Sequence, residues 1–333
     1  MSAHFPDPDT VRAVLTLATQ APSVHNSQPW HWRVGPHSMQ LYADPSRHLP
    51  NTDPDRRDML ISCGAALHHC TVALAALGWQ ARIRRFPNPA EPDHLASLQV
   101  HRQQAGELDI TLAAAIARRR TDRRKYSAWP VPSGDIALMG ARAARAGVML
   151  RQLDLLPDLA AIIARSVRKH TTDADYLTEL NAWSGRYGSV AGVPARNTPA
   201  SDPNAALPAR VFAGPVLAQA AQDSPAEDNA VLLALGTETD DELARLRAGE
   251  ATSLVLLSAT AMGLATCPVT EPLEVPETRE AVRADVFGTS GYPQMMLRVG
   301  WAAVNADPLP ATPRRPLSEV ADWLNDGAFI VGG

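Results

Sequence analysis

Arginines gather in the segment RRRTDRR at residues 118–124, where five of seven residues are arginine. A planar guanidinium binds a phosphate through two parallel hydrogen bonds, and the hydroxyl of Thr121 adds a further donor. The segment therefore points to a phosphorylated ligand. The alternative is a solvated helix end, because arginines in a last turn interact favourably with the negative pole of the helix dipole. Neither GxxxxGK[ST] nor GxGxxG occurs, so P-loop and Rossmann sites lose their usual support.

Three other segments combine unusual residues. APSVHNSQPWHW at residues 21–32 places proline, serine, asparagine and glutamine directly before two tryptophans, which are expected to be core residues at the start of a strand. GLATCPVTEP at 263–272 ends an apolar helix with small residues, and TPRRPLSEV at 312–320 supplies another arginine pair. Taken singly, the last two are a helix end with a proline stop and a solvated tail.

The sequence gives little support for a metal site or for a catalytic nucleophile. His68, His69 and Cys70 are adjacent, and adjacent side chains on a helix point about 100° apart, so they do not converge on a metal. Cys267 has no basic neighbour in sequence to activate it and is expected to be a packed thiol. His25 has no evident acid or nucleophile partner, and neither GxSxG nor HExxH occurs. No metal site is predicted, and no catalytic residue is assigned.

Composition excludes several classes of protein. With 333 residues and 45% hydrophobic content, the chain can form one large domain or two ordinary ones. A net charge of -4 argues against a general nucleic-acid binder. The first residues lack the pattern of a signal peptide, and no stretch is expected to be apolar enough for a membrane helix. We therefore expect a cytoplasmic protein that binds neither nucleic acid nor membrane.

Helices and strands are expected to alternate along the chain. Asp7 or Asp9 can cap a first helix that ends by Pro22. The elements expected after it are strands at 30–34 and 39–42, a long buried helix at 56–77, and strands at 81–85 and 98–101. A second series comprises helices at 108–118, from 133, at 156–167, at 174–183 and at 240–262, with strands at 148–153, 230–236 and 295–299. Residues 196–228 lack a period, which is typical of a functional loop or a disordered linker.

Two helical segments resemble each other. GAALHHCTVALAALGW at 64–79 and GEATSLVLLSATAMGL at 249–264 carry glycines at the same spacing. Alanine-rich helices can imitate one another by chance, but the order of the elements around these two helices is also the same. The pattern indicates an internal repeat.

As a set, these segments resemble the landmark segments of the nitroreductase-like flavoprotein superfamily. In that superfamily the arginine-rich segment usually comes first, whereas here APSVHNSQPW precedes it by about a hundred residues. This order resembles the Acg family of fused nitroreductase homologues. The resemblance implies an α+β nitroreductase-like FMN fold in which two fused halves form an intramolecular pseudo-dimer. The expected halves are residues 1–107 and residues 108–333, the second carrying a lid at 196–228.

The resemblance also implies one FMN per chain. Arginines and Thr121 would hold the phosphate, the backbone of Thr270 would face flavin N5, and the loop after the first helix would hold the ring edge and ribityl chain. The pseudo-symmetric second site would be empty. The FMN-binding residues implied are Pro22, Ser23, Val24, Asn26, Arg119, Arg120, Thr121, Arg123, Pro268, Thr270, Arg314 and Arg315.

Two activities are compatible with such a site. One is an NAD(P)H-dependent oxidoreductase that passes electrons to a small acceptor. The other is an FMN-sequestering or storage protein, in which the lid covers the flavin and little or no nitroreductase activity remains. Expected partners are FMN, NAD(P)H and a small electron acceptor, and the chain is expected to be a monomer or weak homodimer.

Overall fold

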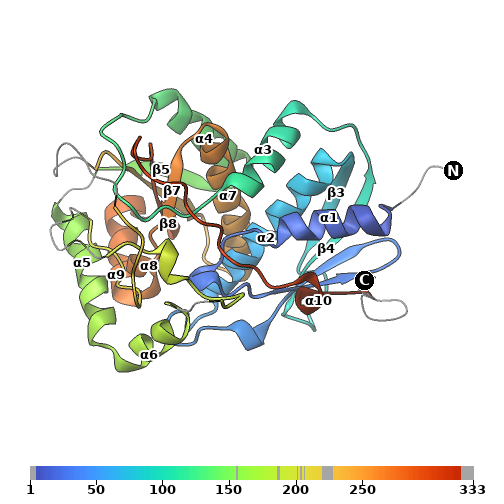
Figure 1. Cartoon of the computed structure of the whole chain (residues 1–333). Coiled ribbons are helices and arrows are strands. Elements are labelled where there is room, and N and C mark those ends of the chain that lie inside the picture. Colours follow the sequence, from blue (N-terminus) through green and yellow to red (C-terminus); the bar gives the residue numbers. More distant parts are fainter. Residues whose placement is uncertain are drawn as a thin grey trace.

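Two β-sheets lie on either side of a central pair of helices in the computed structural model (Figure 1). It describes residues 5–154, 157–185, 188–200, 202, 205, 207–219 and 228–323. Helices and sheets occupy separate regions of the structure, as in other α+β proteins.

The first sheet has the strand order β3-β4-β2-β1-β9. Its strands are β1 (Trp30–Val34), β2 (Met39–Ala43), β3 (Trp79–Arg85), β4 (His94–Arg102) and β9 (Ala321–Trp323). Neighbouring strands are antiparallel, except that β9 runs parallel to β1. Along β1, Trp30, Trp32 and Val34 face the core while the residues between them are more exposed, which confirms the tryptophans as core residues.

The second sheet has the strand order β5-β6-β8-β7 and is antiparallel throughout. Its strands are β5 (Met149–Leu153), β6 (Val231–Thr237), β7 (Ala265–Pro268) and β8 (Tyr292–Gly300). The sequence predicted β5, β6 and β8 but not β7. Small residues and a proline after a helix resemble a helix end, and only pairing with β8 makes this short stretch a strand.

The central helices are α2 (Arg57–Ala76) and α7 (Glu242–Ala261), each of 20 residues, as predicted. They cross at two glycines. A Cβ on Gly64 would lie 2.0 Å from the carbonyl oxygen of Leu246, and one on Gly249 would lie 2.0 Å from that of Ile61. Only glycine lets the two backbones approach this closely.

Helix α2 also corrects one expectation from sequence. It is long and apolar enough to cross a membrane, although no such stretch was expected. However, 78% of its most apolar 18-residue window is buried inside the protein, between the first sheet and α7. We therefore interpret α2 as a core helix.

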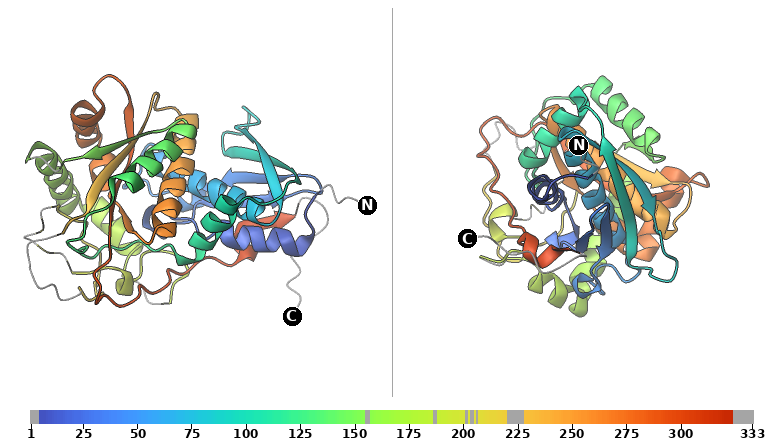
Figure 2. Two further views of the ribbon diagram at one scale, coloured as in Figure 1. Left: turned by 90° about the horizontal axis from the view of Figure 1, so that it is seen from above. Right: turned by 90° about the vertical axis from the view of Figure 1, so that its right-hand side faces the viewer.

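The remaining helices cover the central pair and the second sheet (Figure 2). Helices α1 (Pro8–Ala18), α3 (Glu107–Arg118) and α4 (Ser133–Arg145) pack on α2 or α7. Helices α5 (Pro157–Thr172), α6 (Ala174–Ala182), α8 (Glu271–Glu274) and α9 (Pro276–Val282) form a separate group beside the second sheet. Asp7 caps α1 by accepting from Thr10 N at 2.9 Å, as one of the two predicted caps. Helices α8, α9 and α10 (Leu317–Val320) are too short to show a period and were not predicted.

The chain returns to the first sheet at its described C-terminal end. Helix α10 contacts α1, and β9 pairs with β1 in the register Trp32↔Ala321 (Figure 2). The last described residues therefore pack with elements that come before residue 107. The predicted division into residues 1–107 and 108–333 stays a prediction.

Candidate functional site

A cavity of about 610 Å³ lies between α2, the second sheet and the segment 196–228. Its lining includes the loop after α1, the first turns of α2, the segment after α3, residues of the second sheet and after β7, and described residues of 196–228. Of the residues predicted to bind FMN, it brings together Pro22, Ser23, Val24, Thr121, Arg123, Pro268 and Thr270.

The loop after α1 is held in an unusual backbone conformation. His25, Asn26 and Gln28 have φ values of 47°, 53° and 54°, in the left-handed region that non-glycine residues seldom adopt. Hydrogen bonds hold it there: Ser23 Oγ accepts from Gln28 N at 3.0 Å, and Val24 N donates to Ser62 Oγ at 3.1 Å. The loop is thereby fixed against α2, with Ser23 and Val24 at the cavity wall.

Asn26 does not line the cavity but connects the loop to distant segments. Its amide nitrogen donates to the carbonyl oxygens of Gly192 at 3.0 Å and Pro313 at 3.1 Å. Its Oδ1 accepts from Arg314 at 2.9 Å. The structure therefore places Asn26 where it positions Arg314, and direct contact of Asn26 with a ligand stays a prediction.

Arg119, Arg120 and Arg314 form a group that we call the arginine cluster. Its side chains donate to neutral oxygens: Arg314 to Thr19 O at 2.9 Å, Arg120 to Ala117 O at 2.8 Å, and Arg119 to Thr121 Oγ1 at 3.4 Å. The Nε atoms of Arg119 and Arg120 are buried and have no partner. Among the described residues, no carboxylate pairs with the cluster.

Charge in the arginine cluster is correspondingly uncompensated. Burial lowers the pKa of Arg119 to about 10, with Arg120 and Arg123 adding to the effect. Burial lowers the pKa of Arg314 to about 9, with Arg119 and Arg120 adding to it. A buried guanidinium, that of Arg119, with two half-buried ones beside it and no described carboxylate is the arrangement that an anion stabilises.

Arg315 faces a different environment from its neighbour Arg314. Its guanidinium lies 3.3 Å from Asp44 and 3.3 Å from Glu319, and its backbone N donates to Gln28 Oε1 at 2.8 Å. Two carboxylates thus already neutralise the side chain. The structure does not bring Arg315 into the arginine cluster or the cavity wall.

Arg210, from the segment 196–228, fixes that segment to the cavity wall. It donates to His25 Nε2 at 2.8 Å, to Thr270 Oγ1 at 3.2 Å and to Glu274 Oε1 at 2.5 Å. Burial alone would lower the pKa of Arg210, but the Glu274 charge raises it above its ordinary value. Burial, followed by the charges of Arg210 and Arg123, holds the pKa of His25 well below its usual range. His25 thus has a partner that its sequence neighbourhood did not reveal.

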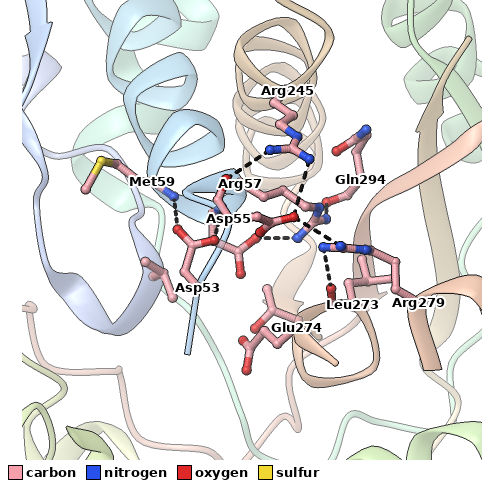
Figure 3. Close-up of polar contacts among 12 residues, drawn as sticks. Asp53, Asp55, Arg57, Met59, Arg245, Leu273, Glu274, Arg279 and Gln294 are labelled. Carbon is pink, nitrogen blue, oxygen red and sulfur yellow. Dashed lines mark hydrogen bonds and ion pairs between the residues drawn. The ribbon is translucent and has the colours of Figure 1, made fainter. Parts of the chain in front are cut away.

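A charge network, buried at Asp53 and Asp58 but exposed at Asp55, lies at the N-terminal ends of α2 and α7 (Figure 3). Asp53 accepts from the backbone N of Asp58 at 2.9 Å and of Met59 at 2.8 Å, in the first turn of α2. Arg245 of α7 bonds Asp240 at 3.1 Å and lies 3.3 Å from Asp55, which tethers the loop before α2 to α7. Burial raises the pKa of Asp58, which lines the cavity, to about 6.

Comparison with known proteins decides the family. Residues 116–301 match the Nitroreductase family. A protein of Mycobacterium tuberculosis (strain ATCC 25618 / H37Rv) named "Putative NAD(P)H nitroreductase Rv3131" is 65% identical over 323 residues, covering 97% of this chain and 94% of the relative. This chain belongs to the Nitroreductase family. The resemblance inferred from the four sequence segments is therefore confirmed.

Other members of the Nitroreductase family are more distant. "Putative NAD(P)H nitroreductase acg" of the same strain is 38% identical over 321 residues, covering 94% of this chain and 95% of the relative. Among solved structures, the FMN and NADPH-dependent nitroreductase NfnB from "sphigopyxis sp. strain HMH" is 19% identical with a TM-score of 0.40, covering 65% of this chain and 99% of that chain. The expected link to Acg-type members is confirmed by the first of these.

Several residues of this nitroreductase-family site were not found from sequence. Asp58 belongs to the run DPDRRD, and the high density of charged residues in this run could have indicated a functional site. Arg210 and Phe212 lie in the segment without a period, where no local pattern marks them. Phe212 carries Arg123 over its ring at 4.8 Å, a contact between residues far apart in the chain.

Proposed function

We propose that this chain binds one FMN, with the phosphate in the arginine cluster and the flavin ring in the adjoining cavity. The observation that carries the proposal is the arginine cluster itself, since its guanidinium groups lack a carboxylate among the described residues. Thr121 joins the two regions, because it contacts Arg119 and also lines the cavity. NfnB is an FMN and NADPH-dependent nitroreductase.

Residue roles follow from these positions. Arg119, Arg120, Arg314 and Thr121 would hold the phosphate. Bound FMN supplies a group that accepts hydride and passes electrons on, so the protein contributes binding and orientation. Thr270 would present its backbone to the flavin, and the loop residues Pro22 to Val24 would hold the ring edge and ribityl chain, while Asn26 fixes that loop.

An NAD(P)H-dependent oxidoreductase acting on a small electron acceptor in the cytoplasm is the activity that we propose. Its support is the name of the relative that is 65% identical. Apolar, hydroxyl and charged side chains line the cavity. Such a lining suits a planar ring, because apolar side chains can pack on the ring and a few polar groups can fix its orientation.

FMN storage under a lid is the second candidate, favoured by a specific observation. Pro199, Ala200, Leu207 and Phe212, all within 196–228, line the cavity. Arg210 fixes the segment to Glu274, and the two side chains are only 8% and 0% exposed. Such a buried ion pair resists opening, because breaking it leaves a charge in a low-dielectric environment.

We also propose that the chain is a fused pseudo-dimer of two nitroreductase-like halves. Helices α2 and α7 have the same length, and their bounds differ by a constant 185 residues. Gly64 and Gly249, which differ by the same offset, meet at the crossing. The sheet orders β3-β4-β2-β1 and β7-β8-β6-β5 match strand by strand. Both sheets also carry an irregularity at the corresponding pair, between Leu41 and Tyr42 and between Leu235 and Gly236.

The same offset supports a single FMN site. Ala65 and Thr270 line the cavity. The residue 185 positions after Ala65 is Glu250, and the residue 185 positions before Thr270 is Arg85. These two residues face a smaller hollow of about 350 Å³ and pair through two hydrogen bonds of 2.7 Å. A bidentate ion pair thus stands where the second half would need an open flavin site.

Stoichiometry and reduction kinetics test the proposal. Purified protein should release FMN at about one equivalent per chain, and reduction by NADH or NADPH should be measurable by stopped flow. Two equivalents would refute the single-site proposal, and a protein that binds no flavin from excess FMN would refute the function. Rapid reduction favours the oxidoreductase, whereas slow reduction with tight binding favours storage.

A further inference from the structure

His69 extends the row of α2 residues that face the cavity. Asp58, Ser62 and Ala65 line the cavity, at helical spacings of four and three residues. His69 follows Ala65 by four residues and therefore lies on the same face, one turn further along the helix. The row begins at Asp58, beside the charge network, and at its far end the charges of Arg119 and Arg314 act on His69.

One ring nitrogen of His69 is already satisfied and the other is not. Nδ1 lies 3.0 Å from Ala65 O and 2.8 Å from Ser253 Oγ. A carbonyl oxygen only accepts, so Nδ1 carries the hydrogen and Nε2 of the neutral ring carries a lone pair. Nε2 is buried without a partner, in a residue that is 0% exposed.

The arginine cluster acts on this nitrogen. Burial holds the pKa of His69 well below its usual range, and the charges of Arg119, His68 and Arg314 lower it further. The charged or titratable groups that act most on His69 are thus Arg119 from the segment after α3, Arg314 from the C-terminal segment, and His68 on its own helix. Neutral Ser253 of α7 contacts the ring directly. No carboxylate is among the main influences on the pKa of His69. The ring is accordingly neutral before an anion binds.

We propose that His69 Nε2 contacts the phosphate of bound FMN, and that this contact takes up one proton from solution. The proposal rests on the proposed FMN function. A phosphate oxygen of the dianion and the Nε2 lone pair are both acceptors, so a hydrogen bond between them needs a proton. The proton forms either the imidazolium or a phosphate hydroxyl, and the count is the same in both cases. Above pH 7 free FMN is largely dianionic, because the second phosphate pKa is about 6.

Calorimetry of FMN and riboflavin binding tests the inference. Titrations at pH 8 in two buffers of different ionisation enthalpy give the number of protons taken up. We expect about one proton for FMN and none for riboflavin, which lacks the phosphate. The FMN affinity should then fall about 10-fold per pH unit above pH 7, relative to riboflavin.

Three variants separate a phosphate contact from a packing role. His69→Leu should lose the proton uptake and weaken FMN roughly 10-fold to 100-fold, with riboflavin unchanged. His69→Gln keeps an amide donor and should bind FMN without proton uptake, and thermal melts confirm that each variant is folded. His68→Gln is the matched control on the adjacent position and should keep the uptake.

Three results would overturn the inference. They are an absence of proton uptake in the unaltered protein, uptake that survives in His69→Gln, and equal losses of FMN and riboflavin affinity in His69→Leu. These differ from failure of the proposed function, in which the unaltered protein binds neither FMN nor riboflavin.

Discussion

Two arginines of the same short segment take different places in the site. Arg119 belongs to the arginine cluster, whereas Arg123 lines the cavity and lies over the ring of Phe212. We therefore expect Arg119→Ala to weaken FMN by roughly 1.5 to 3 kcal/mol, the usual range for a hydrogen bond to a charged group. Riboflavin binding should hardly change. Fluorescence titration of both ligands measures the difference.

Arg123→Ala provides the comparison within that segment. Because this side chain lines the cavity proposed for the flavin ring, its loss should weaken FMN and riboflavin by similar amounts. Added salt should reduce FMN binding more in the unaltered protein than in Arg119→Ala. The reason is that salt screens the attraction between the Arg119 charge and the phosphate, and the variant lacks that charge. If Arg119→Ala binds both ligands like the unaltered protein, RRRTDRR is only a helix end.

Residue-level prediction from sequence depends on local determinants, and the binding roles of the predicted residues stay a prediction. The segments at 21–32 and 118–124 carry their chemistry in adjacent residues, and seven of the predicted residues line the cavity. Arg210 and His69 could not be found in this way. Their roles depend on Glu274 and on Arg119 and Arg314, which are brought near by folding and leave no mark in the neighbouring sequence.

The crossing of α2 and α7 depends on its two glycines. Gly64→Ala places a methyl group 2.0 Å from a backbone carbonyl oxygen, which cannot move aside without shifting the helix. We expect a loss of about 3 kcal/mol or more in the free energy of unfolding, measured by urea denaturation. A second helical glycine, Gly140 of α4, has its nearest neighbour at 4.0 Å, so Gly140→Ala should be neutral or stabilise by up to about 1 kcal/mol. Equal stabilities of the two variants would contradict the close crossing.

The segment 196–228 is expected to control access through Arg210. Arg210→Ala removes the buried pair with Glu274 and should let the segment open, so that NADPH reduces bound FMN about 10-fold faster or more, equivalent to about 1.4 kcal/mol of barrier. Arg196→Ala, in the same segment, loses only a 3.4 Å contact to Ala311 O and is the matched control. Stopped-flow absorbance measures both rates. Equal rates in the two variants would refute the lid.

Elements long enough to show a period were predicted well. Helices α2 and α7 and strands β1 and β2 lie within a residue or two of their expected bounds, whereas α1 ends at Ala18, before the expected end at Pro22. Strands β7 and β9 were missed because each is short and is stabilised by one neighbouring strand rather than by its own pattern. The helical group of α8 and α9 was missed for the same reason of length.

At the scale of the whole molecule, the sequence pattern that suggests the proposed repeat is confined to the two central helices. The strands on either side share an order but not a sequence, because a sheet constrains burial at alternate positions more than residue identity. The proposed pseudo-dimer therefore rests on topology more than on the glycine pattern that first suggested it. Among the described residues, the helical group beside the second sheet has no counterpart beside the first sheet.

The contact between Asn26 and Arg314 joins residues that are 288 positions apart. A ribosome adding about 5 to 20 residues per second needs roughly 15 to 60 s to make the chain between them. During that interval the loop after α1 exists, and later Arg119 does, but the arginine cluster is incomplete and β1 lacks β9. The chain can therefore bind the cofactor fully only after its C-terminal segment has been synthesised. FMN cannot assist the early, co-translational folding of the first sheet, which must hold together on its own packing until the C-terminal segment arrives.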